Sequence, residues 1–161
     1  MVMGGNPIDA LPLSPYDFLG RANDFYCACR FLPDFNAGFM PMWPQIALFG
    51  HAIELVLKAY LLSKGVSAQE LKSGLGHRLE ELIARSVALD LPDEERVARM
   101  IDFVCGPHFT ARARYPNPRD NDKPIAPVQQ FYQDYERLVQ TVTEAMSNAP
   151  ASGGLPHTTN S

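Results

Sequence analysis

The sequence predicts an all-α protein, a single bundle of four to five helices. Apolar residues recur at three- and four-residue spacing along several segments, and residues typical of helix starts and ends flank them. With 46% hydrophobic and 20% charged residues, the composition is that of a globular domain, and 161 residues suffice for one core. We expect a flexible segment over residues 1–13, the bundle over 14–147 and a disordered tail over 148–161, because both ends are rich in small and polar residues.

The first helix is predicted to begin after Ser14. A capping serine, Pro15 at the first helical position and Asp17 in the first turn are typical of a helix start. Pro33 should end the helix, because proline cannot donate the next helical hydrogen bond. The apolar stripe between these points comprises Phe18, Ala22, Phe25, Cys29 and Leu32.

The second helix, over residues 44–64, has the strongest pattern and is predicted to be the central and most buried one. Gly65 follows it as a typical helix-ending residue. Its apolar residues cover most of the helix circumference, so it should contact neighbours on several sides. They are Ile46, Phe49, Ile53, Val56, Leu57, Tyr60 and Leu61.

Three further helices are predicted from caps and periodicity. Ser67 should cap a short helix that ends at residue 72, before a glycine-rich turn. Helices over residues 77–89 and from 92 onward follow, the latter with Val97, Met100, Ile101 and Val104 facing inward. Residues 106–127 contain five prolines and should form a long loop, and loops of this length are often functional.

The last helix is predicted over residues 127–147. Its apolar positions follow the helical period and should face the core. These positions are Val128, Phe131, Tyr135, Leu138, Val142 and Met146.

The net charge of −4 disfavours a broad surface for polyanions, because binding to nucleic acid needs clustered cations. A local basic patch remains possible, as does the alternative of scattered cations on a solvated surface. The residues of the patch would be Arg96, Arg99, Arg112, Arg114, Arg119 and Lys123.

Cysteine usage indicates a reducing compartment, and we expect a cytoplasmic protein. The three cysteines are an odd number, and the N-terminus has neither the basic nor the apolar part of a signal peptide. Cys27 and Cys29 would point about 200° apart on a helix, so we interpret them as small buried residues rather than zinc ligands. The apolar run over residues 53–62 is much shorter than a membrane span.

The candidate chemistry lies in polar residues on the central helix. Phosphate loops, dinucleotide fingerprints and nucleophile elbows are absent from the sequence, so we expect no cofactor. His51, Glu54 and Lys58 follow at spacings of three and four, which places them on one helix face. The simpler alternative is an ordinary surface ion pair between Glu54 and Lys58, and a metal set of His51, Glu54 and His77 is a weaker one.

Two further candidates lie outside this helix. His77 follows Gly76 at a predicted helix start, where its simplest role is to cap or pack under the turn. Arg114 and Tyr115 precede a proline in the long loop, so the Arg114 guanidinium could bind a carboxylate or a phosphate there. A surface arginine beside a buried tyrosine is the alternative for this pair.

Three segments together resemble the HEPN superfamily of helical nucleotide-binding and ribonuclease domains. They are residues 51–62 (HAIELVLKAYLL), residues 76–82 (GHRLEEL) and the Arg114-Tyr115-Pro116 loop. The resemblance implies a bundle of four or five helices, often dimeric, whose central polar stripe faces a groove. Many members are metal-independent ribonucleases with an arginine five to seven residues before a histidine. No histidine of this chain has an arginine there, and Lys72 before His77 comes closest.

Three functional hypotheses follow. The first is a non-catalytic HEPN-like module that binds a nucleotide, RNA or a partner protein such as a nucleotidyltransferase. The second is an atypical ribonuclease with His51 or His77 as general base and Arg114 on the phosphate. The third is a structural scaffold for an operon partner. We also expect a homodimer formed through helix faces, because the first and last helices are rich in aromatic residues.

The pattern makes one geometric prediction. Glu54, Lys58, His77 and Arg114 should converge on one groove, with His51 and Tyr115 at its edge. Arg114 would then pair with Glu54, because a carboxylate on a central helix is costly to bury without a partner.

Overall fold

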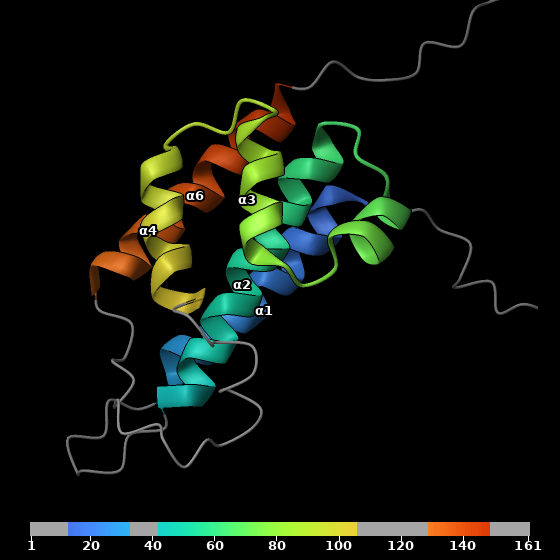
Figure 1. The fold of residues 1–161 in the computed structure, drawn as a ribbon. Helices are drawn as coiled ribbons and strands as arrows, with labels where there is room; N and C mark the ends of the chain where they lie inside the picture. The colour runs from blue at the N-terminus through green and yellow to red at the C-terminus, as the bar shows by residue number, and fades with distance from the viewer. Residues whose placement is uncertain (1–12, 33–41, 106–128, 149–161) are drawn as a thin grey trace, which may run out of the picture.

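The computed structural model describes residues 13–32, 42–105 and 129–148, and within these ranges the protein is all-α, without a strand. The prediction of the all-α class is therefore confirmed. Figure 1 shows the helices packed side by side around one central helix. In chain order they are α1 (Pro15–Phe31), α2 (Met42–Ser63), the π-helical segment η2 (Glu70–Leu75), α3 (Leu79–Val87), α4 (Glu94–Cys105) and α6 (Gln129–Ser147).

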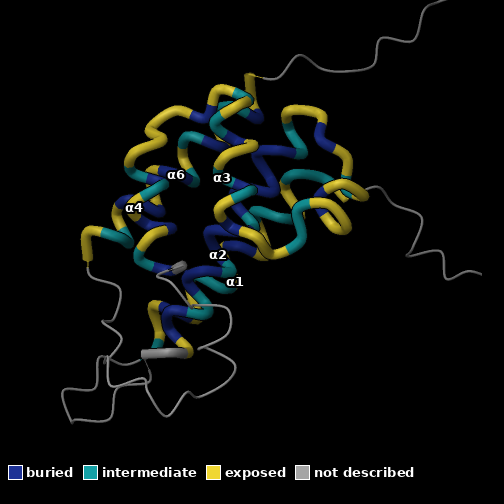
Figure 2. Tube along the Cα trace, viewed as in Figure 1, coloured by how far each residue is buried: buried dark blue, intermediate teal, exposed yellow. Residues whose placement is uncertain are grey.

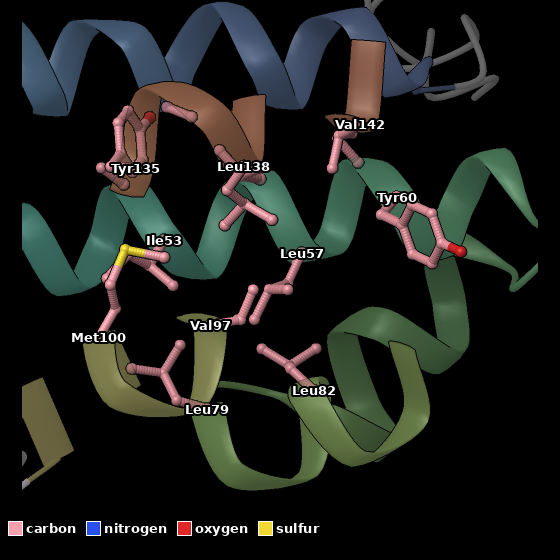
Figure 3. Close-up of a cluster of buried hydrophobic side chains, with 14 of the residues drawn as sticks. Ile53, Leu57, Tyr60, Leu79, Leu82, Val97, Met100, Tyr135, Leu138 and Val142 are labelled. Carbon is pink, nitrogen blue, oxygen red and sulfur yellow. The ribbon is translucent and has the colours of Figure 1, made fainter. Parts of the chain in front are cut away.

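Helix α2 is the central element, as the sequence predicts. It packs against α1, α3, α4 and α6. Ile53, Leu57 and Leu61 are completely buried, and Figure 3 shows side chains of the neighbouring helices converging on Ile53 and Leu57. Burial of each such side chain stabilises the fold by about 1.5 to 3 kcal/mol, so this helix anchors the core. Figure 2 shows that exposed positions lie mainly on the helices around it.

The apolar composition of α2 also satisfies a simple test for a membrane helix. Pro44–Ser63 is long and apolar enough to cross a membrane by length and composition. However, 67% of that window is buried inside the protein. This burial accounts for the composition, because a helix enclosed by others is apolar around most of its circumference.

The predicted caps of the first two helices are present. The Ser14 hydroxyl accepts from the Asp17 backbone N–H, and the Asp17 carboxylate accepts from the Ser14 backbone N–H at 2.7 Å, which completes a capping box. These Ser14 hydrogen bonds lower the pKa of Asp17. Gly65 ends α2 with a φ of 88°, a conformation that glycine adopts without strain.

Aromatic contacts connect α1, α2 and α6. The Tyr26 and Tyr135 rings stack with centroids 4.4 Å apart, and Phe49 of α2 meets the Tyr132 ring edge-on at 5.7 Å. The Tyr26 hydroxyl also donates to Glu136 at 2.6 Å. Burial and the contact with Glu136 both raise the pKa of Tyr26, so the phenol stays neutral and keeps this hydrogen bond.

Several predicted boundaries are wrong by one turn or less. Helix α2 begins two residues earlier than predicted, and α3 begins at Leu79 rather than at His77. The short helix after Ser67 is π-helical at its end, because the Gly76 N–H bonds to the carbonyl of Leu71 five residues back. The predicted 106–127 loop and the terminal segments 1–12 and 149–161 lie outside the described residues.

The interpretation of the cysteine pair is correct for one member and wrong for the other. Cys29 is fully buried, and its thiol contacts the carbonyl of Gln45 at 3.4 Å. Cys27 is exposed, because it lies on the opposite side of α1 and faces away from the core.

Candidate functional site

The candidate site is centred on the Glu54 carboxylate. Glu54 lies on α2, and its side chain is only 6% exposed. The Lys58 ammonium, one helical turn later, is 2.7 Å from Glu54 Oε1, and the Lys58 side chain is 9% exposed. The surface-pair alternative is therefore wrong, because both charges lie under the protein surface. A buried pair of this kind is stable only when each charge keeps its partner.

His77 reaches this carboxylate from a different element. It lies in the turn between η2 and α3, and its Nδ1 is 2.9 Å from Glu54 Oε1 and 3.1 Å from Oε2. The predicted capping role is wrong, since Arg78 is the N-cap residue of α3 and makes no side-chain cap bond. The positive φ of Gly76, 54°, directs the chain into this turn. The turn thus connects α3 to the central helix through a polar contact.

His51 completes the group from the preceding turn of α2. Its Nδ1 is 3.6 Å from Glu54 Oε2, and its side chain is 40% exposed. The His51 and His77 ring centroids lie 6.3 Å apart with nearly perpendicular planes. Phe25 of α1 also packs against His51, with ring centroids 5.3 Å apart. We call His51, Glu54, Lys58 and His77 the Glu54 cluster.

The surroundings of Glu54 keep its carboxylate ionised. Burial alone would raise the pKa of Glu54, because a charge is poorly solvated inside a protein. The contact with His51, the hydrogen bond and positive charge of Lys58, and the contact with His77 outweigh burial and lower this pKa to about 2. At neutral pH the cluster therefore consists of one buried anion, one buried cation and two imidazoles that reach solvent.

No family model, curated protein or solved structure matches this chain.

Of the predicted convergence, the meeting of Lys58 and His77 at Glu54, with His51 beside them, is confirmed. The groove that these residues were expected to line stays a prediction. Spacing on one helix predicts the meeting of His51, Glu54 and Lys58, and the short connection from α2 predicts the approach of His77. Arg114 and Tyr115 lie outside the described residues, so the predicted pair of Arg114 with Glu54 stays a prediction. Among the described residues, no three His, Cys, Asp or Glu side chains are placed to hold a metal ion.

Two contacts were not predicted from the sequence, because the signal for them there is weak or absent. Phe25 contacts His51 only because α1 packs along α2, and nothing near Phe25 in the sequence indicates this. Asp134 is 2% exposed inside α6 and pairs with Arg96 of α4, Oδ1 to Nε, at 3.2 Å. The only hint of this pair is an acid directly before an apolar position of the last helix.

Proposed function

We propose that the chain is a HEPN-like, non-catalytic module that binds a nucleotide or RNA through the Glu54 cluster. The observation that carries the proposal is the pair of solvent-reaching imidazoles on one buried, ionised carboxylate. His77 is 68% exposed and His51 is 40% exposed, while the charges that hold them are buried. Such an arrangement presents fixed hydrogen-bonding groups to a ligand from a rigid helix.

A contribution to stability does not by itself explain why a buried ion pair lies at this position. A buried ion pair usually stabilises a fold less than apolar residues of similar size, because both charges lose their hydration. Three of its four residues lie on α2, the most apolar helix of the described part of the chain, where most neighbouring positions hold buried apolar side chains. Polar groups kept at such a position are candidates for binding, and this supports the proposal.

The family proposal rests on the order of the motifs. Two of the segments that resemble the superfamily contain the Glu54 cluster. They are residues 51–62 on α2 and residues 76–82 at the start of α3. We propose in addition a cytoplasmic homodimer, with a nucleotidyltransferase as a possible class of partner protein. Exposed apolar side chains on and before α1 support the dimer: Leu13, Tyr16 and Phe31. A sedimentation mass of 17.9 kDa at micromolar concentration would contradict it.

Mixed-sequence RNA incubated with the pure protein tests the proposed binding. We expect saturable binding and intact RNA, with or without a chelator. The His77→Gln variant should bind more weakly, and the control Glu144→Gln, an exposed change on α6, should bind as the wild type does. If no RNA or nucleotide binds, the proposal is wrong and a scaffold for a partner protein is the better account.

One observation favours a second function, metal-independent RNA cleavage. A carboxylate on the Nδ1 side of a histidine is the arrangement that orients a general base in many enzymes. His77 has this contact, and His51 is close enough to act on the same ligand. Against cleavage, the sequence lacks the arginine–histidine spacing of the ribonucleases that it resembles. Cleavage that persists with chelator and disappears in His77→Gln would favour this function.

A further inference from the structure

The exposed apolar surface of the described residues is concentrated on α1. The large hydrophobic side chains that stay exposed are Leu13, Tyr16 and Phe31, which are 57%, 61% and 85% exposed. Leu13 lies directly before α1, and Tyr16 and Phe31 lie at its two ends. Single exposed apolar side chains are common on soluble proteins, whereas a group of them on one element marks an interaction surface.

The outer face of α1 is a continuous stripe. At about 100° per residue, four exposed residues of this helix fall within about 60° of its circumference. We call them the α1 stripe, and they are Tyr16, Gly20, Cys27 and Phe31. The stripe is opposite Ala22 and Cys29, which face the core and are fully buried. Its middle is open, since a Cβ added at Gly20 would meet nothing within 4 Å. Another helix can therefore approach closely between the two aromatic ends.

A second, antiparallel copy of α1 fits this stripe along its whole length. The midpoint between Tyr16 and Phe31 falls between residues 23 and 24. When two copies pack about a twofold axis at that midpoint, Tyr16 of one copy lies level with Phe31 of the other. Gly20 and Cys27 are also equally far from the midpoint, so they too lie level with each other across the pair. Both exposed aromatic rings are then covered, and the small residues meet in the middle.

The charges beside the α1 stripe favour the antiparallel orientation. Arg21 and Asp24 lie on the same edge of the stripe, both are exposed, and neither has an ion-pair partner among the described residues. About the same twofold axis, Arg21 of one copy lies only about 3 Å along the helix from Asp24 of the other. Two symmetric pairs of opposite charge therefore form at the rim. In a parallel pair each charge would lie level with its own copy, and the like charges would repel.

We propose that two copies of this chain associate through the α1 stripe, packed antiparallel about an axis between Asn23 and Asp24. The proposal names the interface of the homodimer proposed above and rests on that homodimer. One helix from each chain buries less surface than the roughly 1,200 to 2,000 Å² of a typical stable interface. The dimer should therefore form reversibly, with an affinity that depends on the rim charges as well as on the aromatic contacts.

A disulfide across the interface tests the register. Gly20→Cys places a thiol opposite Cys27 of the partner copy, with about 5 Å between the two Cα atoms, a distance that a disulfide spans. Each of these thiols lies about 10 Å along the helix from its own copy, which is too far for a disulfide. Under mild oxidation, Gly20→Cys should give a covalent dimer on a non-reducing gel. The wild type and the matched control Gly20→Cys/Cys27→Ser should stay monomeric on that gel.

Charge reversal tests the orientation. Arg21→Glu brings two carboxylates together at each rim pair and should weaken dimerisation about three- to tenfold. Arg21→Glu/Asp24→Arg exchanges the two charges and should restore the wild-type affinity. Sedimentation equilibrium measures the dissociation constants, and melting temperatures show that each variant is folded.

The outcomes separate this interface from the homodimer itself. A dimeric wild type with no covalent dimer in folded Gly20→Cys would overturn the proposed interface and leave the homodimer standing. Equal crosslinking in the Gly20→Cys/Cys27→Ser control would do the same, and so would a charge exchange that fails to restore affinity. A wild type that stays monomeric at all concentrations would overturn both proposals.

Discussion

Among the residues that the structure describes, two buried carboxylates have cationic partners, and they differ in what surrounds them. Asp134 on α6 forms an ion pair with Arg96 of α4 at 3.2 Å and accepts a hydrogen bond from Gln130 at 3.1 Å. Arg96 in turn binds Asp93 at 2.6 Å. The ion pair between Arg96 and Asp134 connects α4 to α6, and the other two contacts are local to one helix. Glu54 instead holds two imidazoles whose outer edges reach solvent.

The difference separates a structural contact from a candidate site. Around Asp134, the side chains of Arg96 and Gln130 contact carboxylates of the protein itself. Around Glu54, the His77 Nδ1 contacts the carboxylate while 68% of the His77 side chain is exposed, and His51 lies beside the same carboxylate with 40% of its side chain exposed. Both carboxylates should matter for stability, but only the Glu54 cluster should matter for binding.

The largest expected effect comes from removing the cation next to Glu54. Lys58→Met leaves a buried carboxylate without its main partner and should lower the free energy of unfolding by about 3 to 5 kcal/mol. Urea unfolding at neutral pH measures this loss. Lys72→Met, at an exposed position of η2, is the matched control and should change stability by less than about 0.5 kcal/mol. A Lys58 variant as stable as this control would show that the buried pair contributes little.

Acid should weaken the Glu54 cluster in a defined pH range. The folded-state pKa of Glu54, about 2, is below its ordinary value of 4.5, so its stabilisation is complete above that value and is lost as the pH falls toward 2. The loss should be about 2 to 3 kcal/mol. Urea unfolding between these pH values, compared with a Glu54→Leu/Lys58→Met double variant, isolates this contribution. Parallel pH curves for the two proteins would contradict it.

A smaller effect is expected at the other carboxylate. Asp134→Asn keeps the shape of the side chain but removes the charge that Arg96 binds, and it should cost about 1 to 3 kcal/mol. RNA binding by this variant should equal that of the wild type. Weaker binding by a folded Asp134→Asn protein would remove the distinction drawn between the two regions.

The sequence predicted those features that depend on the geometry of a single helix. Periodicity predicts the burial of Ile53 and Leu57, and helix spacing places Glu54 and Lys58 together, because both depend only on the geometry of a single helix. The burial of that ion pair was not predictable, since it depends on how the neighbouring elements pack. The contact between Arg96 and Asp134 depends on the packing of α4 against α6 and was missed for the same reason.

The central claim is that the paired charges of the Glu54 cluster serve binding, although breaking the pair destabilises the fold. RNA binding by the Glu54→Leu/Lys58→Met double variant tests it most directly, because apolar replacements of a buried ion pair are often neutral or stabilising. We expect a folded protein with a melting temperature at or above that of the wild type and RNA affinity at least tenfold weaker. Wild-type affinity in the folded double variant would contradict the claim.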